Sequence, residues 1–147
     1  LWTTLKHLFR RKVTIKYPEE VREMSPVARL QHMLMRDEEG KERCTACGLC
    51  ALSCPAEAIT MKAAERKADE KHLYREEKYA EIYEINMLRC IFCGLCEEAC
   101  PKEAIYLTKS KKIVNSGYER EDFIYGKDKL VMPLDMAIKN TQTNTVN

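Results

Sequence analysis

Two spacings of hydrophobic residues run along the chain, and each predicts a different kind of element. Short apolar segments predict strands at residues 58–61, 81–86 and 104–107. Near the N-terminus, apolar side chains instead recur at the spacing of one helical face, at Leu1, Trp2, Leu5, Leu8 and Phe9. Helical segments and short strands mixed in this way predict an α+β fold.

Much of the chain between residues 44 and 107 is an internal repeat. The segment CTACGLCALSCPAEAITM, which starts at Cys44, matches CIFCGLCEEACPKEAIYL, which starts at Cys90, and 10 of the 18 aligned positions are identical. Each copy contains a cysteine loop, a short helical piece, a proline and a short strand. The proline disfavours helix at the residue before it, so we expect each helical piece to end at the last cysteine of its copy.

The repeat carries all eight cysteines, in two groups that each have the spacing C-x₂-C-x₂-C-x₃-C-P. Eight cysteines in a small secreted protein suggest disulfides, but these are clustered too tightly to join distant loops. Zinc is the other alternative, although three cysteines spaced two apart suit a tetrahedral zinc site poorly. The spacing is typical of bacterial two-cluster ferredoxins, whose thiolates bind [4Fe–4S] clusters.

The same spacing indicates how the cysteines are divided between two [4Fe–4S] clusters. Three thiolates two residues apart can surround three irons of one cluster, while the fourth, one helical turn later, points toward the other cluster. The expected ligand sets are Cys44, Cys47, Cys50 and Cys100 for the first cluster, and Cys90, Cys93, Cys96 and Cys54 for the second. We expect no catalytic residue.

Several other residues are expected to shape the surroundings of the clusters. Gly48 and Gly94 occupy the same place in each loop, where glycine lets the backbone N–H groups approach cluster sulfurs. Apolar side chains are expected to exclude water: Ile59, Ile105, Leu49, Leu95, Ile91 and Phe92. Three histidines lie outside the repeats and are expected to be surface or packing residues, which does not support a Rieske centre: His7, His32 and His72.

Composition excludes some classes of protein. The net charge of the 147 residues is only +2, although 33% of them are charged, so no nucleic-acid partner is indicated. No apolar run is long enough to span a bilayer, and no signal peptide is visible. The chain opens with Leu1 rather than Met, so we expect its natural start to lie upstream. Residues 62–80 mix both charges densely, which predicts a solvated helix or loop.

The N-terminal segment has a different charge pattern. Residues 1–16 contain five Lys or Arg and no acidic residue, together with Trp2 and several leucines. A basic face opposite an apolar one predicts an interfacial helix that lies at a membrane surface or against a membrane subunit. The alternative is a helix packed on its own domain or on another subunit.

The segments around the cysteines make a more specific resemblance. YEINMLRCIFCGLCEEACPKEAI, residues 83–105, resembles the two-cluster, ferredoxin-like subunit of respiratory complex I, the proton-pumping NADH:quinone oxidoreductase. LWTTLKHLFRRKVTIKYPEE, RDEEGKERCTACGLCALSCPAEAI and EREDFIYGKDKL are similar to further segments of that family, and the resemblance extends over about 130 of the 147 residues. There are two departures. The family commonly has an Arg-Gly pair where this chain has Arg29 and Leu30, and the tail beyond about Pro133 resembles no segment that we can name.

The resemblance implies an electron-transfer subunit that relays single electrons toward a final [4Fe–4S] cluster next to the quinone. The implied partners are other complex I subunits, with peripheral membrane contact through residues 1–16. The implied location is the cytoplasmic side of the bacterial inner membrane, or the matrix side in a mitochondrion. The alternatives are the equivalent subunit of a membrane-bound hydrogenase-type complex and a free soluble ferredoxin. The basic N-terminal segment argues against the latter, because a diffusing carrier needs no anchor.

The expected organisation has three parts. Residues 1–36 form the amphipathic segment and an extended connection. Residues 37–108 form the two-cluster ferredoxin domain, with the charged insertion at 62–80. Residues 109–147 form a C-terminal extension whose polar end, KNTQTNTVN, is expected to be disordered.

Overall fold

Two small antiparallel sheets form the framework of the chain. The computed structural model describes residues 1–25, 27–108 and 117–133. The strands are β1 (His32–Leu34), β2 (Ile59–Glu65), β3 (Lys78–Asn86), β4 (Ile105–Leu107) and β5 (Ile124–Tyr125). The helices are α1 (Trp2–Leu8), α2 (Leu49–Leu52), α3 (Leu95–Glu98) and α4 (Lys127–Leu130), with 3₁₀ helices η1 (Ala68–His72) and η2 (Arg120–Phe123). One sheet pairs β1 with β4, and the other has the order β2–β3–β5.

The β2–β3 hairpin corrects one expectation for the charged insertion. Its register runs from Ile59 opposite Ile85 to Glu65 opposite Lys78, with a shift between Lys62 and Ala63. Strands were expected at residues 58–61 and 81–86, and both are present but longer. The prediction of a solvated helix or loop over residues 62–80 was therefore wrong at both ends, where the residues form the arms of the hairpin. Only the connection between the arms, which contains η1, is the expected loop.

The β1–β4 sheet joins the two ends of the repeat. His32 lies opposite Leu107 in this antiparallel pair, and β1 precedes the first cysteine loop while β4 follows the second. The division into domains stays a prediction. However, β1 lies before residue 37, where the ferredoxin domain was expected to begin, and pairs with β4 inside that domain.

The helical pieces α2 and α3 take equivalent places in the two repeats and end at Leu52 and Glu98, two residues before the expected ends at Cys54 and Cys100. The C-terminal extension also packs on the core: Tyr125 of β5 lies opposite Ile85 of β3. The largest fully buried side chains are Tyr83, Ile85 and Leu130.

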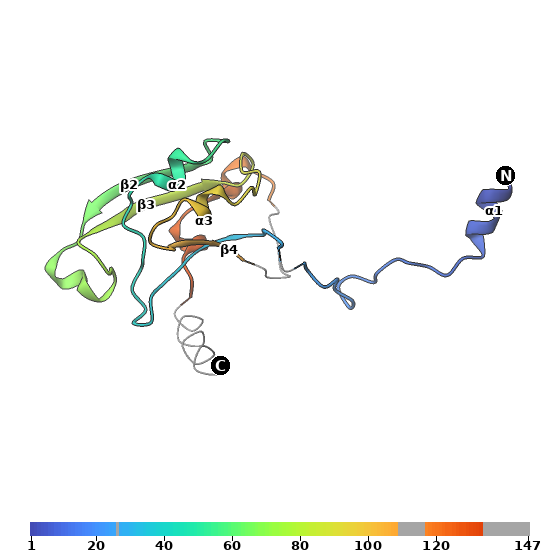
Figure 1. Cartoon of the computed structure of the whole chain (residues 1–147), viewed down its shortest axis with the longest axis horizontal. Coiled ribbons are helices and arrows are strands. Elements are labelled where there is room, and N and C mark those ends of the chain that lie inside the picture. Colours follow the sequence, from blue (N-terminus) through green and yellow to red (C-terminus); the bar gives the residue numbers. More distant parts are fainter. Residues whose placement is uncertain (26, 109–116, 134–147) are drawn as a thin grey trace.

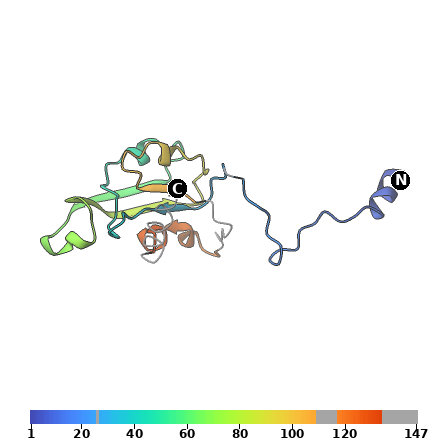
Figure 2. The ribbon, with the colours of Figure 1, turned by 60° about the horizontal axis from the view of Figure 1, so that its bottom comes forward.

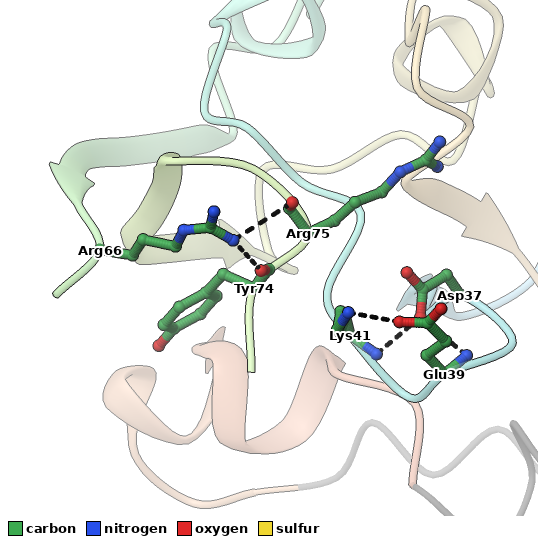
Figure 3. Close-up of polar contacts among 6 residues, drawn as sticks. All are labelled: Asp37, Glu39, Lys41, Arg66, Tyr74 and Arg75. Atoms are coloured by element: carbon green, nitrogen blue, oxygen red, sulfur yellow. Dashed lines mark hydrogen bonds and ion pairs between the residues drawn. The ribbon is translucent and has the colours of Figure 1, made fainter. Parts of the chain in front are cut away.

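Polar contacts hold the connections that surround this core. The Asp37 carboxylate accepts hydrogen bonds from the backbone N–H groups of Glu39 and Lys41, at 3.0 and 2.8 Å, and closes the turn ahead of the first cysteine (Figure 3). Across the hairpin connection, Arg66 donates to the carbonyl oxygens of Tyr74 and Arg75, at 2.7 and 3.3 Å (Figure 3). These bonds order loops that have little apolar surface of their own.

The N-terminal segment projects away from the sheets, as Figures 1 and 2 both show. None of the residues of α1 is buried. The alternative in which this helix packs on its own domain is therefore not what the structure shows. In the described part of the chain, no helix has the length and hydropathy needed to cross a bilayer. The polar run at residues 139–147 lies outside the described residues.

Candidate functional site

Each cysteine loop passes through left-handed backbone just before its helix begins. Gly48 precedes α2 with a φ of 86°, and Gly94 precedes α3 with a φ of 84°. Ala46 and Phe92, two residues before each glycine, also have positive φ, at 50° and 54°. Glycine adopts this conformation without the steric cost that a Cβ atom adds. The sequence repeat is therefore also a repeat of backbone geometry, and the two loops follow the same path.

The eight cysteines line two cavities, and each cavity takes cysteines from both repeats. The first cavity, of about 330 Å³ including space open to solvent, is edged by Cys44, Cys47, Cys50 and Cys100. The second, of about 320 Å³ on the same measure, is edged by Cys54, Cys90, Cys93 and Cys96. All eight cysteines are free thiols. The fold thus gathers the residues that the spacing grouped together.

Apolar side chains form the walls of each cavity between the thiols. Leu34, Met61 and Ile105 line the first cavity, and Ile59, Ile85 and Ile91 line the second. Three of the six apolar residues expected at the clusters, Ile59, Ile91 and Ile105, are therefore in place. The other three, Leu49, Leu95 and Phe92, are not in the described lining of either cavity. Leu49 and Leu95 are 42% and 41% exposed at the starts of α2 and α3, and Phe92 is partly buried against the core.

Burial changes the acidity of the thiols. It raises the pKa of Cys44 to about 11 and that of Cys96 to about 12, and it also raises the pKa of Cys50 and Cys90. Desolvation is the largest cause in each case, because an apolar surrounding disfavours the charged thiolate. Metal binding requires the thiolate, so a bound metal must supply the energy that removes these protons.

Backbone N–H groups point at several cysteine sulfurs. Phe92 donates to Cys90 Sγ at 3.4 Å within the second loop. The fourth cysteine of each repeat accepts from the residue four positions later, Ala58 N–H to Cys54 Sγ at 3.4 Å and Ala104 N–H to Cys100 Sγ at 3.2 Å. Sulfur that is bound to iron accepts such bonds readily. Four thiols, apolar walls and inward N–H groups at each cavity together fit a [4Fe–4S] cluster better than a structural zinc ion.

Two polar side chains lie at the cysteines, although neither was expected there from the sequence. Tyr83 is 1% exposed, and its Oη lies 3.4 Å from Cys50 Sγ. His32 is 3% exposed, and its Nε2 lies 3.7 Å from Cys90 Sγ. Burial raises the pKa of Tyr83 far above its usual value and lowers that of His32 to about 4. His32 is a packing residue, as expected, but its contact with Cys90 depends on a pairing between strands that no local pattern reveals.

Arg29 supports the second cysteine loop from outside. Its guanidinium donates to the Cys93 carbonyl oxygen and pairs with Glu98 of α3 at 3.0 Å. The next residue, Leu30, stands where the family commonly has glycine, and its backbone N–H donates to the Thr108 carbonyl at 3.2 Å. The departure from the Arg-Gly pair therefore leaves the arginine in contact with the loop.

Comparisons with known proteins agree with this geometry. A family model described as a 4Fe–4S dicluster domain matches residues 43–104. In the solved structure of the membrane-bound sulfane sulfur reductase, an archaeal respiratory membrane complex, one chain is similar to 92% of this chain. That match spans 64% of the other chain, at 26% identity and a TM-score of 0.58.

Curated relatives are far more similar in sequence. NADH-quinone oxidoreductase subunit I of Flavobacterium psychrophilum is 80% identical over 147 residues, which are 100% of this chain and 80% of that protein. The subunit I of Cytophaga hutchinsonii is 69% identical over 131 residues, 89% of this chain and 74% of that protein. Subunit 9 of the Thermus thermophilus enzyme is 46% identical over 132 residues, which are 90% of this chain and 71% of that protein. The chain therefore belongs to the subunit I family of NADH-quinone oxidoreductase, as an electron-transfer subunit of complex I with two [4Fe–4S] clusters on an α+β, ferredoxin-like fold.

Proposed function

We propose that the two clusters are held by crossed sets of cysteines. Cys44, Cys47 and Cys50 of the first repeat bind one cluster together with Cys100 of the second repeat. Cys90, Cys93 and Cys96 bind the other cluster together with Cys54. The observation that carries this proposal is the lining of the two cavities, each of which has three cysteines from one repeat and one from the other.

When bound, the clusters supply one-electron transfer, and the protein itself transforms no substrate. The residues of the chain have three tasks. The cysteines fix the separation of the two centres, because each repeat contributes to both cavities. The apolar walls exclude water, and the N–H groups on the sulfurs adjust the electrostatic environment. The crossing also ties the two repeats to each other, so loss of a single ligand disturbs more than its own loop.

We also propose a place for the chain within complex I. It relays electrons that originate from NADH in other subunits toward the quinone-proximal cluster, low in the hydrophilic arm. It lies peripherally on the cytoplasmic side of the bacterial inner membrane, with residues 1–16 at the membrane end. The projecting, unburied α1 and its five basic residues support this placement. Among the alternatives, the hydrogenase-type complex is less well supported, because the similarity at 80% identity is to the NADH-quinone enzyme.

Reciprocal cysteine variants in the intact complex test the crossing. Cys54→Ala should damage the cluster on Cys90, Cys93 and Cys96 and spare the other, and Cys100→Ala should do the opposite. The measurement is electron paramagnetic resonance (EPR) of the reduced complex. Each signal is assigned beforehand from Cys47→Ala and Cys93→Ala, whose cysteines lie in the middle of each loop. If Cys54→Ala and Cys47→Ala abolish the same signal, the ligands do not cross.

Ser53→Ala is a matched control for these variants. Ser53 is the neighbour of Cys54, and its hydroxyl donates to the Leu49 carbonyl at 2.8 Å without reaching a cysteine sulfur. It should leave both signals unchanged. A loss of signal in Ser53→Ala would mean that the turn is sensitive to any substitution, and the cysteine result would then not assign ligands.

A further inference from the structure

Among the described residues, each cavity has one polar side chain that comes from outside the cysteine loops and contacts a cysteine sulfur. At the first cavity it is Tyr83, whose Oη is 3.4 Å from Cys50 Sγ. At the second it is His32, whose Nε2 is 3.7 Å from Cys90 Sγ. Both side chains are almost completely buried. Buried polar groups are costly unless they form hydrogen bonds, so their position beside sulfur requires an explanation.

The direction of each hydrogen bond follows from the chemistry of the ligand. A cysteine bound to iron is a thiolate and has no proton, so its sulfur can only accept. The Tyr83 hydroxyl must then donate to Cys50, and the His32 Nε2–H must donate to Cys90. The His32 ring then carries a proton on Nε2. Within the described part of the chain, the other ring nitrogen, Nδ1, has no hydrogen-bond partner, so the sulfur is the polar contact that accounts for the position of the ring.

Rigid elements hold both donors. Tyr83 lies in β3, the central strand of its sheet, directly opposite Met61 of β2. His32 lies in β1 opposite Leu107 of β4, and its ring packs at a tilt against Phe92 with the centroids 5.5 Å apart. A donor held on a strand keeps its geometry when the charge of the nearby cluster changes. The two donors differ in chemistry and in distance, whereas the cysteine loops around them are nearly identical.

We infer that Tyr83 and His32 are residues that tune the redox potentials, one for each cluster. The inference rests on the proposed function in one respect, that Cys50 and Cys90 bind different clusters. It does not require that Cys54 and Cys100 cross between the clusters. Reduction adds one negative charge to a cluster. A hydrogen bond to its thiolate is stronger in that state, especially where the dielectric constant is low. Each donor therefore raises the potential of its own cluster, and the pair gives two similar sites individually set potentials.

The test is an anaerobic redox titration of the intact complex, followed by EPR. Signals are assigned to the two clusters from Cys50→Ala and Cys90→Ala. Tyr83→Phe removes one hydroxyl and keeps the ring. At a fixed ambient potential, the ratio of reduced to oxidised Cys50 cluster should fall on the order of tenfold. For a one-electron couple this corresponds to a reduction potential lower by about 59 mV. The potential of the Cys90 cluster should not change.

His32 variants give the reciprocal result and a rescue. His32→Leu should lower the potential of the Cys90 cluster alone, by a smaller amount because the contact is longer. His32→Gln keeps an N–H donor and should restore most of the potential, which a purely structural role for the ring does not predict. An unchanged Cys50 cluster in Tyr83→Phe overturns the inference for Tyr83. Equal shifts of both clusters in the His32 variants, or no recovery in His32→Gln, overturn it for His32.

Discussion

At the scale of single residues, two positions that the sequence repeat makes equivalent have different surroundings. Gly48 and Gly94 have nearly the same positive φ. A Cβ atom on Gly48 would meet no atom within 4 Å, but a Cβ atom on Gly94 would lie 2.7 Å from Arg29 Nε. Arg29 is half exposed and can give way, but its guanidinium must then move from Glu98 and the Cys93 carbonyl, to which it is bound. Glycine is therefore needed at both positions for its backbone, and at Gly94 also for space.

Alanine substitutions should separate these two requirements. Gly48→Ala should destabilise its loop by about 1–2 kcal/mol, the cost of left-handed backbone for an L residue. Gly94→Ala should cost more, because Arg29 must also leave its partners. The measurement is the loss of each cluster's EPR signal when the anaerobic complex is heated in steps. Adding Arg29→Ala to Gly94→Ala should relieve the additional cost, and equal effects of the two single variants would contradict the proposed role of Arg29.

The residues that could be predicted from the sequence are those whose role depends on local spacing. The eight cysteines and the two glycines lie in short, repeated motifs, and the dicluster family match includes all of them. Tyr83 and His32 could not be found in this way. They reach Cys50 and Cys90 across 33 and 58 residues of sequence, through strand pairings that exist only in the folded chain.

At the scale of elements, the β2–β3 hairpin shows why its charged arms were misread. Ala63 lies opposite Ala80 and Lys62 opposite Ile82, so Glu81 is an extra residue in β3. Such a bulge breaks the alternation of a strand, and the buried positions become Ala80, Tyr83 and Ile85. The outer arms face solvent, and a solvated ribbon carries the same mixed charges as a solvated helix. Composition alone could not separate the two.

One lysine ties the C-terminal extension to this hairpin. Lys127, at the start of α4, pairs with Glu42 at 2.7 Å and donates to the Ala80 carbonyl at 2.8 Å. Its ammonium also lies over the stacked rings of Tyr74 and Tyr79, 5.0 and 5.6 Å from their centroids. The pair is largely buried, so removing one partner leaves the other charge without compensation.

Lys127→Met should therefore loosen the C-terminal extension by about 1.5–3 kcal/mol, the usual contribution of hydrogen bonds to a charged group. Amide hydrogen exchange of β5 and α4 in the complex measures this as faster exchange. Glu42→Gln in the same chain should recover part of the protection, because the unpaired charge is then absent. The control is Lys129→Met on the same helix, which removes a cation from above Tyr125 and a hydrogen bond to the Asp122 carbonyl at 3.2 Å. Its effect should be smaller, about 0.5–1 kcal/mol, because these contacts are exposed. Similar effects of the two lysine variants would show that the buried pair has no special role.

At the scale of the whole molecule, the core and the N-terminal segment differ in what covers their apolar side chains. The core buries a cluster of its own apolar side chains, which come from both sheets and both cysteine repeats. In the N-terminal segment Trp2 is 70% and Phe9 82% exposed, and the segment extends away from the sheets (Figure 1). Exposed aromatic side chains beside a cluster of basic residues are typical of a surface that binds a membrane or another protein. A partner outside this chain is thus expected to cover them.

Deleting residues 1–16 should weaken assembly with the membrane arm and lower the rate of quinone reduction by NADH. Both clusters should remain, because every proposed ligand lies at or beyond Cys44 and no residue of α1 is buried in the core. The measurements are the co-purification of the other subunits, quinone reductase activity and the EPR signals of the two clusters. A matched variant that replaces only the five basic residues with Gln separates the sources of binding. It should weaken assembly strongly if anionic lipid headgroups hold the segment, and weakly if apolar contact with a membrane subunit does. Normal assembly and full activity after the deletion would refute the docking role, whereas loss of both clusters would mean that the segment supports the core despite its exposure.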